Sequence, residues 1–234
     1  MIKNGLIDVS NIDGVPVRID LIPKSNKTSR PQYKMTPRLI CIHNTGNKAK
    51  GANAKMHTQY VDNTTNYVSW HFTVDDKEIF QELPINESAW HSGDGSKGKG
   101  NRTAIAIEIC ENEGIDWEKA KLNAVKLIHF LMKYVKTLNN APIKTHKYFS
   151  GKYCPHRILD EGLGKFLATV DNYKGVLTPP IKKPRIIVPH WAEPYYKTLT
   201  EKYKLDLTAK RFDDKMSRGE VMAILVKLLE AGKL

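Results

Sequence analysis

A histidine and a cysteine lie eight residues apart between Thr145 and His156 of this 234-residue chain. Imidazole and thiolate groups, here those of His146 and Cys154, bind zinc at roughly 2.0–2.3 Å. A third ligand is available far upstream, because His43 ends an apolar run at a polar turn. Two histidines and one cysteine leave the fourth tetrahedral position open, as catalytic zinc sites do and structural ones do not. The pattern therefore predicts a catalytic zinc centre, in which the pKa of a bound water falls towards ~7.

Two other histidines compete for a place among the ligands. His156 lies two residues beyond Cys154, and His71 lies within the apolar segment 68–74. Spacing alone leaves both open as alternatives.

A single acidic side chain, Glu108, interrupts the apolar segment 103–110. Burying an unpaired carboxylate is costly, so we expect Glu108 to be paired or functional. A carboxylate beside an activated water can accept its proton and pass it to a leaving amine. Glu108 is therefore the candidate general base.

The elements that must position these residues follow from the apolar pattern. Buried strands are expected at 38–43 and 103–110, with a hairpin formed by 68–74 and 78–83. Helices are expected at 52–62, after Asp116 as N-cap, and at 157–172. Residues 1–36 and 141–155 are expected to be irregular, and Ala52, Met56 and Tyr60 to form the packed face of the first helix. This alternation predicts an α/β domain, a mixed central β-sheet flanked by helices with the zinc site at the sheet edge.

A proline-rich stretch divides the chain. Four prolines between Thr178 and Pro189 predict an extended linker over 176–189, after a catalytic domain at 1–175. The remaining residues, 190–234, form a small and mainly helical module, in which Ser217 to Glu220 make a capping box.

The composition limits the class of protein. With 37 basic and 25 acidic residues the chain carries a net charge of +12, and the 12 basic and 7 acidic residues after position 175 show that the charge is spread along it. Basic proteins bind polyanions such as nucleic acid, anionic lipid or the teichoic-acid-rich bacterial wall. No nucleic-acid-binding motif stands out, which argues against a nucleic-acid partner.

Three other properties concern location and redox state. No apolar run is long enough to span a membrane, and the first ten residues lack the apolar core of a signal peptide, so we expect synthesis in a cytoplasm. Three cysteines do not make a disulfide framework, and we expect Cys41 and Cys110 to be small buried hydrophobes.

Five motifs in order over roughly residues 35–172 resemble the type-2 N-acetylmuramoyl-L-alanine amidases, a family that includes T7-lysozyme-like enzymes and the peptidoglycan recognition proteins. The motifs are His43-Asn-Thr, the segment 68–76 (VSWHFTVDD), the segment 89–95 (AWHSGDG), the segment 100–103 (GNRT) with 107–109 (IEI), and the segment 145–157 (THKYFSGKYCPHR). The nearest likeness is to amidase endolysins of phages and prophages of Gram-positive spore-formers.

The resemblance assigns roles to these residues. It implies that His43, His146 and Cys154 hold Zn²⁺, in preference to His71 and His156. It also implies that Glu108 is catalytic and that Lys152 stabilises the oxyanion of the tetrahedral intermediate. The residues of the motifs that we expect to contact substrate are Asn44, Thr45, Trp70, Trp90, His91 and Arg102.

One position departs from the family pattern. T7-like members carry a tyrosine where Trp70 stands, and tryptophan has no phenolic proton to transfer. This departure favours Glu108 further as the base.

The resemblance implies hydrolysis of peptidoglycan between N-acetylmuramic acid and L-alanine, in phage-driven host lysis after export through a holin. A bacterial autolysin is the alternative role. Within the same fold, a non-catalytic peptidoglycan-binding module is the alternative function, but such proteins typically lack the cysteine ligand. The segments starting at His190 and at Met216 are similar to halves of an S-layer homology repeat, which implies a wall polymer as a further partner.

Overall fold

The computed structural model describes residues 1–175 and, beyond them, only residues 226, 228 and 232. The expected linker at 176–189 and the expected helical module at 190–234, including its capping box, lie outside the described residues.

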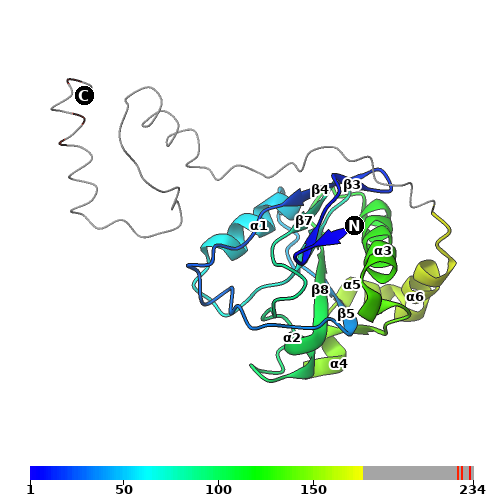
Figure 1. The fold of residues 1–234 in the computed structure, drawn as a ribbon. Coiled ribbons are helices and arrows are strands. Elements are labelled where there is room, and N and C mark those ends of the chain that lie inside the picture. The colour runs from blue at the N-terminus through cyan, green and yellow to red at the C-terminus, as the bar shows by residue number, and fades with distance from the viewer. Residues whose placement is uncertain (176–225, 227, 229–231, 233–234) are drawn as a thin grey trace. The chain divides into compact units, whose positions relative to one another are not determined.

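A mixed seven-stranded sheet forms the centre of residues 1–175, in the order β3-β4-β7-β6-β8-β5-β9 (Figure 1). Its strands are β3 (Asn11–Ile12), β4 (Val15–Ile19), β5 (Leu39–Asn44), β6 (Phe72–Val74), β7 (Ile79–Gln81), β8 (Ala104–Ile109) and β9 (Ile143–Thr145). β5 is parallel to both β8 and β9, whereas β6 and β7 are the antiparallel arms of the expected hairpin. The expected mixed sheet is therefore confirmed.

Helices cover both faces of the sheet (Figure 1). They are α1 (Ala54–Asn63), α2 (Lys99–Thr103), α3 (Trp117–Tyr134), α4 (His146–Ser150), α5 (His156–Glu161) and α6 (Leu163–Asn172), with a 3₁₀ turn at Lys136–Leu138. α1 lies on one face, and α3 and α6 lie on the other. Asp116 caps α3 as expected, since its Oδ1 accepts a hydrogen bond of 3.1 Å from the backbone N–H of Lys119.

The register of β5 and β8 places core residues on one face of the sheet and candidate catalytic residues on the other. Ile40 and Ile42 pair with Ile105 and Ile107, and all four join the buried cluster under α3. Because successive side chains alternate between faces, the residues between them point the other way. His43 and Glu108 are register partners on that second face, at the carboxyl ends of their strands.

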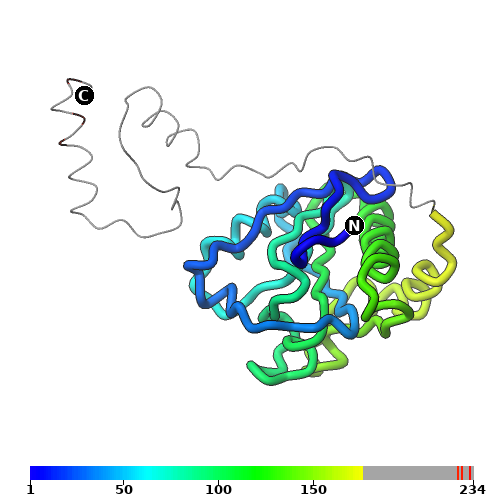
Figure 2. The backbone as a smooth tube through the Cα atoms, viewed as in Figure 1, coloured from blue at the N-terminus to red at the C-terminus, as the bar shows by residue number. Residues whose placement is uncertain are grey.

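The N-terminal segment is more regular than expected. Residues 1–36 were expected to be irregular, but β3 and β4 extend the central sheet, and β1 (Ile2–Lys3) pairs with β2 (Leu6–Ile7). Pro16 does not prevent this, because the pairing of β4 with β7 begins only at Val17. Figure 2 shows the long connection from β4 to β5 passing around the outside of the domain.

Two expected helices also differ from the structure. The buried face of α1 consists of Ala54, His57, Thr58 and Val61, while Tyr60 is 44% exposed. The buried face of α1 differs from the expected one because two of the buried residues, His57 and Thr58, are polar. The hydroxyl of Thr58 donates a hydrogen bond to Glu82. The helix expected at 157–172 is interrupted at Gly162, whose φ of +100° separates α5 from α6.

The expected loop 141–155 contains further regular structure. It includes the edge strand β9 and the short helix α4. Cys41 and Cys110 are buried, free cysteines, as expected.

Candidate active site

Three separate elements bring His43, His146 and Cys154 together. His43 lies near the end of β5, His146 is the first residue of α4 directly after the edge strand β9, and Cys154 lies between α4 and α5. All three are buried, and one ligand atom from each lies within 4.8 Å of the other two. The group thus lies beside the edge strand β9, which ends directly before His146.

The distances fit the donor set of a zinc site. The Nδ1 of His43 and the Sγ of Cys154 are 3.7 Å apart. Two ligands bound at roughly 2.0–2.3 Å in tetrahedral geometry lie about 3.5 Å from one another. The ring centroids of His43 and His146 are 5.0 Å apart. Two imidazoles and a thiol at this spacing could therefore hold one zinc ion without rearrangement of the backbone.

The protonation of these groups also suits a metal. Burial lowers the pKa of His43 well below its ordinary value, with His91 adding to the effect. Burial likewise lowers the pKa of His146 to about 4. Both rings are therefore neutral at physiological pH, as metal ligands must be. Burial raises the pKa of Cys154 to about 12, so its thiolate would form through metal binding.

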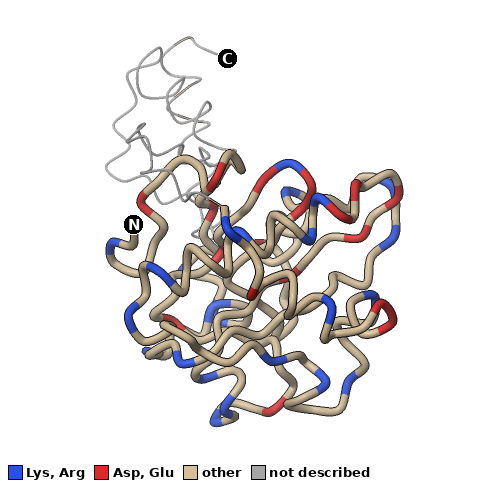
Figure 3. The backbone as a smooth tube through the Cα atoms, turned by 90° about the vertical axis from the view of Figure 1, so that its right-hand side faces the viewer, with Lys and Arg blue, Asp and Glu red and all other residues tan. Residues whose placement is uncertain are grey.

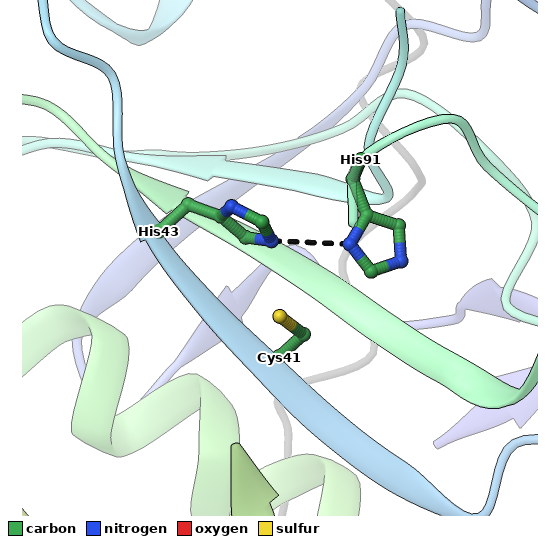
Figure 4. A group of neighbouring side chains, drawn as sticks. All are labelled: Cys41, His43 and His91. Carbon is green, nitrogen blue, oxygen red and sulfur yellow. Dashed lines mark hydrogen bonds between the residues drawn. The ribbon is translucent and has the colours of Figure 1, made fainter. Parts of the chain in front are cut away.

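A second group of potential ligands shares His43. Cys41, His43 and His91 also offer ligand atoms within 4.8 Å of one another. Figure 4 shows a hydrogen bond between the rings of His43 and His91, with the thiol of Cys41 beside them. His91 lines the main cavity of the described residues, as do His146 and Cys154, but Cys41 does not. The group with His146 and Cys154 is the one open to a substrate.

The two competing histidines have other partners. The Nδ1 of His71 accepts a hydrogen bond from the backbone N–H of Ala106, and its Nε2 donates to the carbonyl of Glu87. Both ring nitrogens are thus used in the core. The Nε2 of His156 lies 2.8 Å from a carboxylate oxygen of Glu111. Neither histidine belongs to a potential metal group of the described residues.

Glu108 faces the group of ligands. Its Oε1 lies 3.8 Å from the Nδ1 of His43, and its Oε2 has no hydrogen-bond partner. Burial raises the pKa of Glu108 to about 8, against the nearby positive charge of Lys152. A carboxylate with one uncommitted oxygen and a pKa near neutrality can accept and return a proton. Lys152 is exposed at the mouth of the same cavity.

The cavity has a volume of about 720 Å³, and both candidate catalytic residues, Glu108 and Lys152, line it. Five of the six expected substrate contacts line it, namely Asn44, Thr45, Trp70, Trp90 and His91. Buried polar atoms of four of them have no partner: Asn44 Nδ2, Thr45 Oγ1, Trp90 Nε1 and His91 Nε2. Such atoms are costly unless they pair, and a polar substrate could supply the partners. Trp70 instead donates a hydrogen bond of 2.6 Å from its Nε1 to the Oγ1 of Thr73. This bond fixes the orientation of the Trp70 ring, which forms part of the cavity wall.

Arg102 is the expected contact that does not line the cavity. Its guanidinium lies over the ring of Tyr33, 4.7 Å from the centroid. Tyr33 in turn meets the edge of Trp90, with the ring centroids 6.2 Å apart. Arg102 therefore contacts the cavity only indirectly, through Tyr33, which packs against the cavity residue Trp90.

Several residues that line the cavity were not expected from the sequence, among them His57, Tyr60 and Tyr67. His57 and Tyr60 lie in α1, where helical spacing suggested packing alone, and Tyr67 precedes the 68–76 motif. The Nε2 of His57 is buried without a partner, and Tyr67 meets the edge of Trp90. The one sequence signal for His57 and Tyr60 was a polar and aromatic face on a short helix, and Tyr67 had only its place directly before the 68–76 motif.

The charged residues are spread over the described residues. Figure 3 shows Lys and Arg positions on many segments of the tube, with Asp and Glu between them. Within the part of the chain that the structure describes, no helix is both long and apolar enough to cross a bilayer.

Comparison with known proteins identifies a family for the region that contains this site. Residues 33–157 match the family model described as N-acetylmuramoyl-L-alanine amidase. The N-acetylmuramoyl-L-alanine amidase CwlH of Bacillus subtilis (strain 168) is 53% identical over 149 residues, covering 62% of this chain and 58% of CwlH. The chain therefore spans less than two thirds of the length of that relative.

Solved structures agree over the same region. The catalytic domain of XlyA is 47% identical with a TM-score of 0.62, and the match covers 67% of this chain and 99% of that one. A mutant endolysin from Bacillus subtilis is 47% identical with a TM-score of 0.63, covering 67% of this chain and 99% of that one.

Proposed function

We propose, because the chain belongs to the N-acetylmuramoyl-L-alanine amidase family, that it is a zinc-dependent hydrolase of peptidoglycan. The bond cleaved is the amide that joins the lactyl group of N-acetylmuramic acid to L-alanine. The observation that carries the proposal is the convergence of His43, His146 and Cys154, whose ligand atoms lie within 4.8 Å of one another. His146 and Cys154 line the same cavity as Glu108, and the Oε1 of Glu108 lies 3.8 Å from the Nδ1 of His43.

The three ligands would hold the zinc, and the ion would polarise the amide carbonyl and make water more acidic. Glu108 lies where its free oxygen can accept the proton of the attacking water. It then returns this proton to the nitrogen of L-alanine, so that the amine leaves neutral. Glu108 thus acts first as the general base and then as the general acid.

Lys152 stabilises the negative charge that develops on the carbonyl oxygen. Its ammonium group belongs to the cavity lining and affects both Glu108 and His146 electrostatically. A fixed cation acts most strongly where charge appears in the transition state and not in the substrate. In this proposal the oxyanion forms on the Lys152 side of the cavity.

Glu108→Gln tests the assignment of the base. The substitution keeps the shape of the side chain but removes its capacity to accept a proton. We expect release of new amino groups from purified walls to fall by about 10²–10⁴-fold, the usual contribution of general acid–base catalysis. Zinc content should stay at the wild-type level. Retention of lytic activity would place the base elsewhere.

The product analysis also separates this function from a non-catalytic recognition module. An amidase releases amino groups from walls without new reducing sugars, and a chelator should abolish this release until zinc is added back. A binding module would retain the wall but release neither product. Cys154 favours the enzyme, because it completes the ligand group.

The biological role that we propose is lysis of a bacterial host by a phage or prophage endolysin. Support comes from the similarity to a solved endolysin of Bacillus subtilis. In this role the chain is made in the host cytoplasm and reaches the wall after a holin opens the membrane. Lysis of a Gram-positive host from within only when a holin is co-expressed would support this role, whereas lysis without holin would contradict it.

A further inference from the structure

We propose that His91 is a positioning residue for the metal, and that it acts by accepting a hydrogen bond from the outer ring nitrogen of His43. The inference rests on the proposed zinc function. It changes the role expected from the sequence, in which His91 contacts the substrate.

The two rings are in direct contact (Figure 4). The Nε2 of His43 and the Nδ1 of His91 are 3.1 Å apart, and the ring planes are at 87° to one another. His43 is 1% exposed and His91 is 6% exposed. A hydrogen bond in so dry an environment is costly to break, because neither nitrogen could turn to solvent.

The direction of this hydrogen bond follows from the other side of His43. Its Nδ1 faces the Sγ of Cys154 at 3.7 Å and the Oε1 of Glu108 at 3.8 Å. If Nδ1 is the metal ligand, the hydrogen of the neutral ring must be on Nε2. His43 then donates and His91 accepts. Such an outer partner fixes both the tautomer and the orientation of a ligand histidine.

His91 is itself held in place by Asn101 of the short helix α2. The Oδ1 of Asn101 accepts 2.9 Å hydrogen bonds from the backbone N–H groups of His91 and Ser92. It also accepts a bond of 2.8 Å from the hydroxyl of Ser92. Asn101 therefore anchors the backbone of His91 and, through the ring of His91, the metal ligand.

Cys41 offers a competing explanation of the same contact. A metal held by Cys41, His43 and His91 would use Nε2 of His43 and replace this hydrogen bond. Cys41 is completely buried and does not line the cavity, so an ion there would be shielded from substrate. We therefore assign the contact to a hydrogen bond, and the experiment includes Cys41.

The test measures zinc affinity of the full chain by competition with a chromophoric chelator. His91→Leu fills similar space but has no acceptor, whereas His91→Asn places its Oδ1 near the position of the lost Nδ1. We expect His91→Leu to bind zinc about 10–100-fold more weakly, the usual effect of removing such a partner. His91→Asn should recover most of the affinity, and Cys41→Ser should bind as the wild type does.

Kinetics at saturating zinc provide the second measurement. A positioning role predicts a lower kcat for His91→Leu, with a KM close to that of the wild type. A substrate contact would raise KM and leave zinc affinity unchanged, and that result would overturn the inference. Loss of zinc from Cys41→Ser would overturn it too, since the ion would then lie on the other group.

The outcomes for the two proposals are distinguishable. A wild-type chain that binds no zinc refutes the zinc function itself, whereas equal affinity of wild type and His91→Leu refutes only the role of His91. If His91→Leu does not fold, His91→Gln replaces it, because its amide oxygen lies one bond further out. Zinc affinity of His91→Gln equal to that of His91→Asn would then contradict the inference.

Discussion

Glu108 and Glu82 are enclosed to different degrees, since Glu82 is fully buried and Glu108 is only partly buried. Glu108 lines the cavity and keeps one oxygen free for chemistry. Glu82 is completely buried away from it, with Oε1 accepting a hydrogen bond of 3.0 Å from Thr58. Burial raises the pKa of Glu82 well above its ordinary value, although the hydroxyls of Thr73 and Thr58 oppose this. Substitution of Glu108 is therefore expected to affect activity, whereas substitution of Glu82 is expected to affect stability.

Glu82→Gln should change how stability depends on pH. Because the pKa of Glu82 is raised in the folded state, stability falls as pH rises from the unfolded value of about 4.5 towards the folded value. Glutamine cannot ionise, so the stability advantage of the variant should grow with pH, by at most about 1.4 kcal/mol per pH unit. Urea unfolding at pH 5, 6, 7 and 8 measures this.

The matched control is Glu113→Gln, since Glu113 is exposed in a loop. Its stability should follow the wild-type curve across the same pH range. Parallel curves for Glu82→Gln and the wild type would mean that Glu82 is ionised in the folded state, contrary to this account.

Lys152→Ala should reduce turnover without loss of zinc. Removing one group that stabilises an oxyanion costs about 10²–10³-fold in kcat. Since Lys152 is exposed, folding should be unaffected. Lys147→Ala is the control, because Lys147 is exposed in α4, over the ring of Tyr153, and does not line the cavity. Equal kcat values for the two variants would remove Lys152 from the mechanism.

At the scale of elements, the short helix α2 and the loop before it are packed without spare room. A Cβ on Gly100 would lie 2.5 Å from the side chain of Ser92 and 3.0 Å from that of Phe149. Ser92 cannot yield easily, because its hydroxyl is bonded to both Asp94 and Asn101. This segment therefore requires glycine at position 100.

Gly100→Ala should destabilise the domain by about 1–3 kcal/mol, the usual cost of overpacking. It should also weaken zinc binding, because Asn101 next to it holds the backbone of His91. Gly164→Ala is the contrasting variant: its Cβ would meet nothing within 4 Å, and it lies in α6. That substitution should stabilise by up to about 1 kcal/mol. Chemical unfolding of both variants measures the difference, and equal stabilities would refute the packing argument.

For the whole molecule, the question is what the residues beyond the catalytic domain contribute. The family match ends at residue 157, and the chain carries a net charge of +12 that is shared between both parts. A basic chain is attracted to anionic wall polymers. The resemblance of the segments at His190 and Met216 to an S-layer homology repeat favours the same partner.

Deletion of residues 178–234 should therefore weaken binding to isolated walls and leave cleavage of a small soluble muropeptide unchanged. Sedimentation with purified walls measures the first, and release of amino groups measures the second. Unchanged wall binding would end the targeting hypothesis. Loss of cleavage would instead mean that the tail supports the catalytic domain.

By itself, the sequence determined what depends on residue type and on local pattern. Residue type and spacing predicted a zinc site with His43, His146 and Cys154 as candidate ligands, because few side chains bind zinc. They left His71 and His156 open, and the choice among the histidines came from the family resemblance. The hairpin of β6 and β7 and the capped start of α3 were predictable because turns and caps depend on neighbouring residues.

The tertiary structure decided what depends on contacts between distant segments. The exclusion of His71 as a ligand required the backbone of Ala106 and Glu87 to occupy both its nitrogens. The strands before residue 20 and the buried face of α1 depended on pairing and polar contacts that no short pattern records. The pairing of His43 with His91 is of the same kind, because the orientation of a ring is set by whatever packs against it.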